Sequence, residues 1–454
     1  MFLQVLRAQD IFALCVKRWN EIKLGEVIQT LDGGIFNDDT LEKAYNNGAR
    51  YALIGIPEDI GPRANGGRAG AQSCWRAFFK YFANQQSNCF LQGREILAVG
   101  SIRCRDLQEE SIRIPEGADK LNYLRGLCAR LDERIFPVIA TLIAYGFIPI
   151  IIGGGHNNSY PIIKGVALGL SLARLHRDIL REHPLVRLAF GENGFALGQN
   201  FNKRPLVISK NAAKLAEALD NINSGRSREA KNAMSDSICP EEMSLAEAVR
   251  HHLRKANEMD EETNRLGPVD DSGQHFFPIS VVNCDPYGEF MALEGRHSGN
   301  SFSYAKLARY LDHYCLVYYH EDYNPSNMLT YMHEQGVRAF SYDSVFIRRE
   351  FGSSETLDFV RKLMLSTSEP IGIELDLDSI EDIPTSESTP YGIPASEAAY
   401  YIHLLSSTLP AVYCYLPEGA PSLATDGERK VGKMLALLVS AFIKGHNWQC
   451  QNCN

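Results

Sequence analysis

Short, almost continuously apolar runs alternate with longer helical patterns through most of this 454-residue chain. A run that is apolar at nearly every position is typical of a parallel strand that is covered on both faces. Eight such runs occur, at residues 49–57, 95–102, 147–155, 277–285, 315–322, 337–342, 370–378 and 411–419. The alternation predicts an α/β protein with a single doubly wound, mostly parallel eight-stranded sheet and helices on both faces.

The helical patterns lie between these runs, at residues 71–82, 131–146, 159–180, 304–314, 354–365, 396–407 and 427–445. We expect a helical N-terminal extension over 1–48, an α/β domain over 49–445 and a short tail over 446–454. The connection from 156 to 285 is much longer than the ~30 residues of a strand–helix–strand unit. Its polar middle predicts an insertion at about 180–275, of the kind used as a lid or an interaction arm.

Charge, hydropathy and cysteine usage exclude several protein classes. The net charge of −9 argues against a nucleic-acid partner. Without a signal-peptide pattern or an apolar stretch of about 18 residues, we expect no membrane segment and a cytoplasmic protein. The 11 cysteines are scattered, as is typical of reduced, buried thiols. Only Cys450 and Cys453, close to His446, are spaced like metal ligands, and we interpret them as part of a frayed tail.

Polar side chains gather where four of the predicted strands end, around His156, around Asp285, between Glu374 and Asp378, and around Glu418. Ligands of open parallel sheets bind at the carboxyl ends of the strands. Asp376 and Asp378 are two residues apart, so on a strand they share a face, which Glu374 can join. Buried carboxylates need a compensating cation, and Mn²⁺ or Mg²⁺ suits oxygen and imidazole ligands. Solvated carboxylates and a hydrogen-bonded loop histidine are the alternative interpretation.

The order of these motifs resembles the ureohydrolases, the family of arginase, agmatinase and formimidoylglutamase. The segments are Gly-Gly-Gly-His156, Asp285-x-x-x-Glu289, Glu374-Leu-Asp-Leu-Asp378 and Pro417-Glu-Gly-Ala-Pro421. The first segment, with Asn65-Gly-Gly-Arg68 and Arg296-His-Ser-Gly-Asn300, is most similar to formimidoylglutamase. The resemblance implies the arginase-like three-layer fold and a homo-oligomer.

The resemblance also implies a manganese centre of one or two ions and a set of residues around it. One metal would take His156, Asp285, Glu289 and Asp376, and the second would take Asp285, Tyr287, Asp376 and Asp378. Asp378 would relay a proton, and Glu418 would face the cationic nitrogen group of the substrate. The implied substrate contacts are Asn157, His297, Asn300 and Asn324. A turn-forming role explains Asn324 equally well.

Two ligand positions depart from the family pattern. Tyr287 stands where the family has a histidine, and a neutral phenol is a much poorer ligand than an imidazole. Glu289 replaces an aspartate and is longer by one methylene. These departures make the second metal position the weaker of the two.

Two functions therefore remain open. The first is a metal-dependent hydrolase that cleaves a C–N bond in a small amidine or guanidine, as formimidoylglutamase or arginase does. The second is a degenerate family member that holds one metal or none and acts in binding or assembly through the 180–275 insertion. An unrelated α/β enzyme is a third interpretation. The Gly-rich turn lacks the spacing of a nucleotide-binding loop, and the sequence has no nucleophile-elbow motif for a Ser–His–Asp triad.

Overall fold

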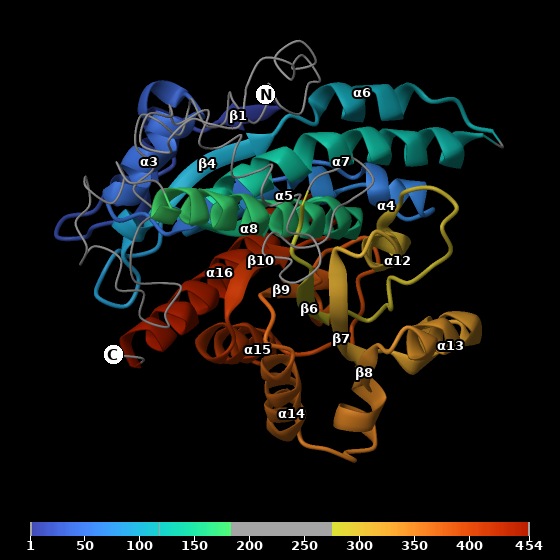
Figure 1. Ribbon diagram of the computed structural model, residues 1–454. Coiled ribbons are helices and arrows are strands. Elements are labelled where there is room, and N and C mark those ends of the chain that lie inside the picture. The colour runs from blue at the N-terminus through green and yellow to red at the C-terminus, as the bar shows by residue number, and fades with distance from the viewer. Residues whose placement is uncertain (1, 118, 183–274, 453–454) are drawn as a thin grey trace, which may run out of the picture.

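Ten strands form one sheet in the computed structural model, which describes residues 2–117, 119–182 and 275–452 (Figure 1). The strand order is β1-β4-β3-β5-β10-β9-β6-β7-β8, and β2 also pairs with β4. Only β1 runs antiparallel among the strands described. The strands are β1 (Leu3–Val5), β2 (Gln29–Thr30), β3 (Tyr51–Gly55), β4 (Ile96–Ile102), β5 (Ile148–Ile152), β6 (Ile279–Cys284), β7 (Leu311–Tyr319), β8 (Arg338–Ser341), β9 (Ile371–Leu375) and β10 (Ala411–Leu416).

The predicted fold class is confirmed, because all eight apolar runs form strands of one mostly parallel sheet with helices on both faces. The sheet is larger than predicted by two short strands. Both come from the first 48 residues, where β1 and β2 add to β4. The expected helical extension is therefore part of the sheet edge as well, alongside α1 (Ala8–Phe12), α2 (Leu24–Val27) and α3 (Asp38–Asn46).

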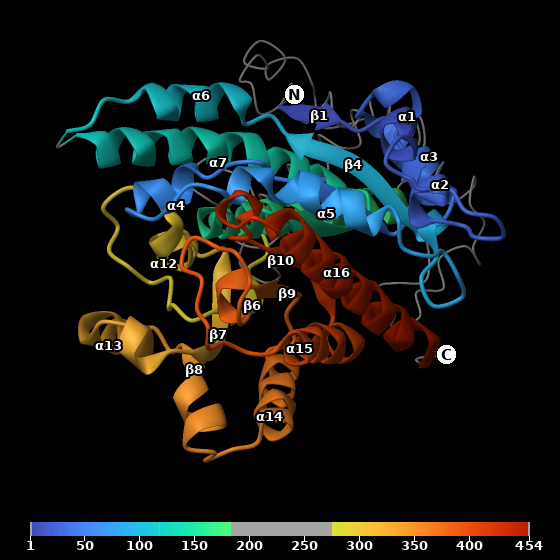
Figure 2. The ribbon, with the colours of Figure 1, turned by 180° about the vertical axis from the view of Figure 1, so that it is seen from behind.

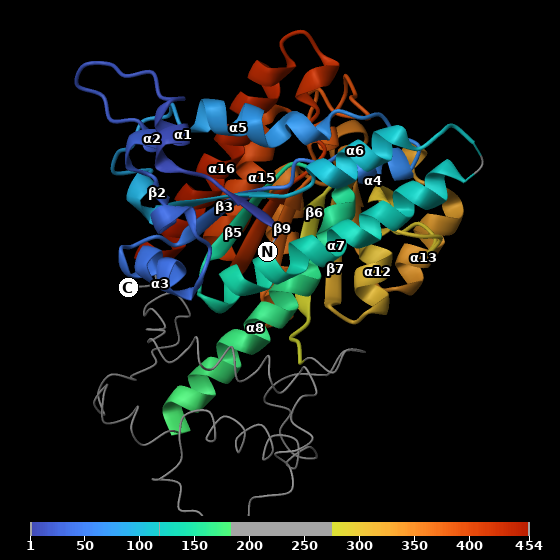
Figure 3. The same cartoon turned by 90° about the horizontal axis from the view of Figure 1, so that it is seen from above.

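The helices form two layers, and Figures 2 and 3 show the sheet between them. One layer buries side chains of α3, α4, α7, α8, α12 and α13 against the sheet. The other buries side chains of α1, α2, α5, α14, α15 and α16. The remaining bounds are α4 (Ile60–Ala64), α5 (Cys74–Phe82), α6 (Arg105–Arg113), α7 (Lys120–Ala144), α8 (Ser159–Glu182), α12 (Ser301–Leu307), α13 (Ser326–Glu334), α14 (Ser353–Ser366), α15 (Ala395–Thr408) and α16 (Gly427–Asn452).

Strand β5 shows why the apolar runs lack a polar face. Ile151 packs into the first core, whereas Ile150 and Ile152 pack into the second. Successive side chains of a strand point to opposite faces, so a strand covered on both sides is apolar at every position. The hydrophobic core therefore consists of two layers of side chains, one on each face of the β-sheet.

Two expected elements are placed differently by the structure. The helical pattern predicted over 304–314 ends with α12 at Leu307, and β7 begins at Leu311. Arg309 adopts a left-handed φ of 61°, which stops the helix there. The predicted tail at 446–454 is largely helical, because α16 continues to Asn452. His446 anchors this end, since it is buried and lies 2.9 Å from the hydroxyl of Tyr51.

The predicted insertion at about 180–275 lies almost entirely outside the described residues, as does Cys453. Among the helices described, none combines the length and apolar character that crossing a membrane requires.

Candidate metal centre

The strand order brings the polar loops together at one end of the sheet. Strands β5, β10, β9, β6 and β7 are consecutive neighbours, and their carboxyl ends point the same way. The side chains that follow these strands, in spatial order, are His156, Glu418, Asp376, Asp285 and Asn324. They come from segments far apart in the sequence, so parallel pairing alone makes them neighbours.

His156 is the centre of this group. Its Nδ1 lies 2.9 Å from Oδ2 of Asp285 and 2.9 Å from Oδ2 of Asp376. The three side chains are almost fully buried. Despite these short distances, Nδ1 has no hydrogen bond of acceptable geometry. The nitrogen and the two carboxylate oxygens thus face one another, and among the described residues only Oδ2 of Asp285 has a hydrogen-bond donor, the Asn283 amide at 3.1 Å.

The two aspartates are oriented by the same device. Oδ1 of Asp285 accepts the backbone N–H of Tyr287 at 2.8 Å, and Oδ1 of Asp376 accepts that of Asp378 at 2.7 Å. Each carboxylate therefore uses one oxygen to cap the following turn and turns the other toward His156. Strand β9 ends at Leu375, so Asp378 belongs to the 3₁₀ turn Leu377–Ser379 and not to the strand face predicted for it.

This arrangement needs a positive charge. Burial and the charge of Asp285 raise the pKa of Asp376, and burial and Asp376 raise that of Asp378. Burial lowers the pKa of His156, but the carboxylates of Asp285, Asp376 and Glu374 at 2.9 to 3.0 Å outweigh it and raise the pKa well above its usual value. Either a proton on Nδ1 or a metal ion can supply the charge. One imidazole nitrogen and two carboxylate oxygens within 4.8 Å of one another fit a divalent cation.

Glu374 fixes which nitrogen of His156 faces the aspartates. This fully buried carboxylate lies 3.0 Å from His156 Nε2 and accepts the hydroxyls of Ser159 at 2.5 Å and Tyr413 at 2.6 Å. A carboxylate on Nε2 holds the proton there and leaves the Nδ1 lone pair for a metal. The sequence had marked Glu374 only as a possible neighbour of Asp376, and its partner His156 lies on another strand end.

Glu58 holds the Gly-rich turn and was missed by the sequence analysis. It is buried after β3, and its Oε1 accepts the backbone N–H of Gly155 at 2.7 Å and the amide of Asn158 at 2.7 Å. The signal was present in the sequence, because Glu58 is a carboxylate that directly follows a predicted strand. It positions the backbone that carries His156.

The remaining predicted metal ligands are close to this cluster but less well placed. Glu289 is buried with an unpartnered Oε2, and burial and Asp285 raise its pKa. Tyr287 stacks its ring on Tyr323, with centroids 5.4 Å apart and planes at 24°. Burial and the charge of Asp378 raise the pKa of Tyr287, which keeps the phenol protonated. A second metal would thus have to use a neutral phenol.

Glu418 has one buried carboxylate oxygen without a hydrogen-bond partner. Its Oε1 accepts the backbone N–H of His156 at 2.7 Å, while Oε2 is buried without a hydrogen-bond partner. The residue adopts a left-handed φ of 64°, and burial and Asp376 raise its pKa. A strained backbone that presents an unpaired carboxylate oxygen is typical of a binding site.

Three of the predicted substrate contacts have other partners in the structure. Asn300 uses both ends of its amide within its own loop and with Arg296. Asn157 is buried, and its side chain lies against Gly61 and Asn158. Asn324 accepts the backbone N–H of Gly288 and donates to the carbonyls of Pro286 and His320. It therefore clamps the loop that carries Asp285, as the turn-forming interpretation favours.

His297, the fourth predicted contact, is buried and caps a 3₁₀ turn by accepting the N–H of Gly299 at 3.1 Å. Burial and the charges of Arg125 and Arg296 lower its pKa to about 4, so its Nε2, which has no hydrogen bond, stays neutral.

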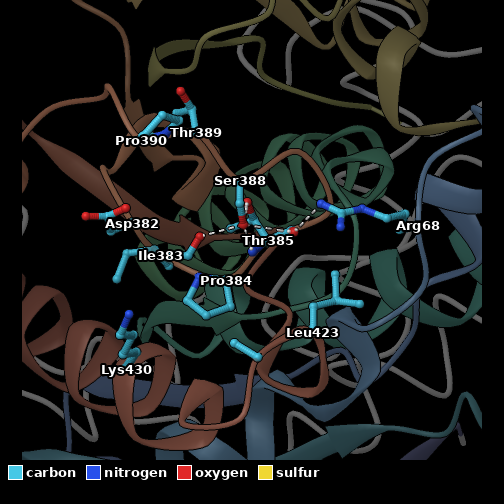
Figure 4. A pocket seen from close by; sticks show the side chains of 11 residues that line it. Arg68, Asp382, Ile383, Pro384, Thr385, Ser388, Thr389, Pro390, Leu423 and Lys430 are labelled. Atoms are coloured by element: carbon cyan, nitrogen blue, oxygen red, sulfur yellow. Dashed lines mark hydrogen bonds between the residues drawn. The ribbon is translucent and has the colours of Figure 1, made fainter.

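A surface pocket of about 340 Å³ adjoins the site without containing the His156 cluster. Figure 4 shows Arg68 on one side of the 383–390 loop and Lys430 on the other. Arg68 Nε donates to the Ser386 carbonyl at 2.7 Å. The link to the centre is the 383–390 loop itself, because Thr385 lines the pocket and the backbone N–H of Glu387 reaches Oδ1 of Asp378 at 3.4 Å.

Comparison with known proteins gives relatives in fold but not in sequence. No family model and no curated protein sequence matches the chain. The formimidoylglutamase from Bacillus subtilis subsp. subtilis str. 168 has a TM-score of 0.56 and 13% identity, over 95% of this chain and 94% of its own. Trypanosoma cruzi formiminoglutamase with Mn²⁺ has a TM-score of 0.52 and 16% identity, over 93% of this chain and 99% of its own. The resemblance predicted from the motifs is thus confirmed at the level of the fold.

Proposed function

We propose that this protein is a metal-dependent hydrolase that cleaves a C–N bond in a small amidine or guanidine substrate. The observation that carries the proposal is the buried convergence of His156 Nδ1, which has no hydrogen bond, with the Oδ2 atoms of Asp285 and Asp376. Manganese is the metal of the formiminoglutamase structure that shares the fold. When bound, such an ion supplies Lewis-acid activation of water.

The protein's own residues would divide the remaining work. Glu418 would bind an N–H of the cationic substrate through its unpartnered Oε2 and so align the carbon to be attacked. Burial and the charge of Asp376 raise the pKa of Asp378, so this carboxylate would take up a proton and pass it to the leaving nitrogen. Glu374 would keep His156 in one tautomer.

The test combines metal analysis with product assays on the full-length protein. We expect purified protein to retain Mn²⁺ and to release formamide from N-formimidoylglutamate, or urea from arginine or agmatine. The Glu418→Gln variant should keep the metal and lose at least about 100-fold in kcat/KM. Glu428→Gln is the matched control, because Glu428 lies in an exposed ion pair with Lys80. Absence of both metal and product across this panel would reject the proposal.

The second candidate is a degenerate protein that binds at most one metal and does not hydrolyse. The neutral phenol of Tyr287, stacked on Tyr323, favours it, because the resemblance implies a metal ligand at this residue. Metal content separates the two functions at the outset. Two tightly held ions per chain would contradict the degenerate protein, whereas one ion with product release would support a one-metal hydrolase.

A further inference from the structure

A buried ion pair lies beside the turn that carries His156. Arg296 and Asp132 are 5% and 4% exposed, and Nε of Arg296 donates to Oδ2 of Asp132 at 2.9 Å. The guanidinium lies over the rings of Tyr160 and Tyr304, at 4.8 and 5.0 Å from their centroids. It therefore has a carboxylate that balances its charge and two aromatic faces that hold its orientation.

The two remaining nitrogens of Arg296 bond two separate segments. Nη2 donates to the backbone carbonyl of Asn157 at 2.5 Å, and Nη1 donates to Oδ1 of Asn300 at 3.1 Å. Asn157 belongs to the turn after β5, whereas Asn300 ends the connection from β6 to α12, which covers residues 285–300 and begins with Asp285. One side chain thus joins the two segments that carry predicted metal ligands.

Ser301 makes the neighbouring bond to the same turn. It is fully buried, and its hydroxyl donates to the backbone carbonyl of His156 at 2.7 Å. The ring of Phe302 packs edge-on against the His156 imidazole, with centroids 5.7 Å apart and planes at 83°. Two consecutive carbonyls, those of His156 and Asn157, therefore accept hydrogen bonds from Ser301 and Arg296.

The backbone N–H groups of this turn are held by acceptors. Glu58 and Glu418 accept the N–H groups of Gly155 and His156, each at 2.7 Å. Buried backbone groups need partners of both kinds, so the carbonyls of the turn need the donors that come from the neighbouring connection. A metal ligand whose backbone is fixed in this way is already oriented before the ion binds, and loss of such outer partners weakens metal affinity.

We propose that Arg296 and Ser301 are positioning residues that tie the turn carrying His156 to the connection carrying Asp285. The inference deepens the proposed function and rests on it, since it concerns how two segments of the candidate centre are held together. Asp132 supplies the charge that a buried guanidinium requires. Arg296 can bond a carbonyl, an amide and a carboxylate at once because its donors form a rigid planar fork, which the ammonium group of a lysine lacks.

The first experiment measures amide hydrogen exchange in the metal-free, full-length protein, in the peptide that covers residues 153–160. In Arg296→Lys this peptide should exchange at least about 10-fold faster than in the wild type, because the Asn157 carbonyl and the Asn300 amide lose their shared donor. Ser301→Ala should raise the rate about 3-fold, since it removes one hydrogen bond. Unchanged exchange in Arg296→Lys would overturn the proposal.

Arg134→Lys is the matched control for the loss of a guanidinium. Arg134 lies on α7, which also carries the carboxylate partner of Arg296, and it bonds the carboxylate of Asp106 and the backbone carbonyl of Arg103. None of these partners belongs to the candidate centre. This variant also disturbs an ion pair, yet exchange in residues 153–160 should stay as in the wild type.

Two further outcomes have a defined meaning. An equal rise of exchange in all peptides of Arg296→Lys would indicate a general loss of stability and would overturn the proposal. If Arg296→Lys does not fold, Ser301→Ala decides, and unchanged exchange in that variant would overturn the proposal as well.

Calorimetric titration with Mn²⁺ then separates this inference from the proposed function. Arg296→Lys should lose about 10-fold in Mn²⁺ affinity, whereas Arg134→Lys should stay within about 3-fold of the wild type. Unaltered affinity in Arg296→Lys, with hydrolysis by the wild type, would reject the positioning role and keep the hydrolase. A wild type that binds no Mn²⁺ and hydrolyses nothing would reject the hydrolase, and the exchange measurement alone would then decide the positioning role.

Discussion

Among the described residues, one histidine and two carboxylates meet at two places, at opposite ends of the sheet. His156, Asp285 and Asp376 lie at the carboxyl ends of the strands, where their side chains are at most 3% exposed. Asp312 and His313, near the start of β7, meet Glu369, just before β9, and their side chains are 47%, 54% and 19% exposed. The residue types are the same, but the surroundings are opposite.

The difference teaches that burial, and not the ligand set, makes a candidate metal site. Water can solvate His313 and its two acids, and Glu369 also accepts the hydroxyl of Ser280. The charges around His156 are buried away from bulk solvent, so a bound cation or a proton must relieve their repulsion. The buried cluster is also oriented by Glu374 and by two backbone N–H groups.

The largest expected difference is in Mn²⁺ affinity, between a variant that lacks His156 and one that lacks His313. His156→Ala should weaken Mn²⁺ binding by more than about 100-fold, because it deletes a ligand that surrounding residues hold in place. His313→Ala should leave Mn²⁺ affinity within about 3-fold. Calorimetric titration and the metal content after dialysis measure both. Equal losses in the two variants would remove the distinction between the clusters.

Lowering the pH should reduce the free energy of unfolding, because His446 is buried in its neutral form. Burial lowers the pKa of His446 to about 4, against about 6.5 when unfolded. The unfolded chain binds the extra proton between these values, so His446 contributes stability above pH 6.5 that is lost as the pH falls toward 4. The expected loss is about 3 kcal/mol in the free energy of unfolding.

Urea unfolding of the wild type and of His446→Gln, measured from pH 7 to pH 4, tests this expectation. The variant should show a shallower pH dependence over that window. His313→Gln is the exposed counterpart, and its pH dependence should match the wild type. The same slope in His446→Gln and in the wild type would show that this histidine does not carry the effect.

A smaller effect on Mn²⁺ affinity is expected from Glu374, whose carboxylate contacts Nε2 of His156. Glu374→Gln keeps a hydrogen-bond acceptor for Nε2 but loses the charge, so Mn²⁺ affinity should fall about 10-fold. Glu369→Gln is the matched change in the exposed cluster and should have little effect. Titration of both variants with Mn²⁺ gives the comparison, and an unaltered affinity in Glu374→Gln would mean that Glu374 does not tune the ligand.

The sequence predicted much of this fold because each strand carries its signal locally. Ile150, Ile151 and Ile152 are apolar in succession since both faces of β5 are covered. The helix expected at 304–314 was wrong beyond Leu307, because the left-handed φ of Arg309 leaves no strong sequence signal. The polar residues at the strand ends could be recognised because they directly follow apolar runs in the sequence. His156, Asp285 and Asp376 were therefore predicted together.

The sequence by itself thus determined the layered α/β architecture and the polar residues that follow its strands. Tertiary structure decided how these residues are used. The placement of β10 between β5 and β9 brings Glu418 to His156, and no local pattern encodes that order. Tertiary contacts also stack Tyr287 on Tyr323 and place the Glu374 carboxylate at hydrogen-bond distance from His156. The physical reason is that periodicity reports which face of an element is buried, whereas partners across a sheet depend on which strands become neighbours.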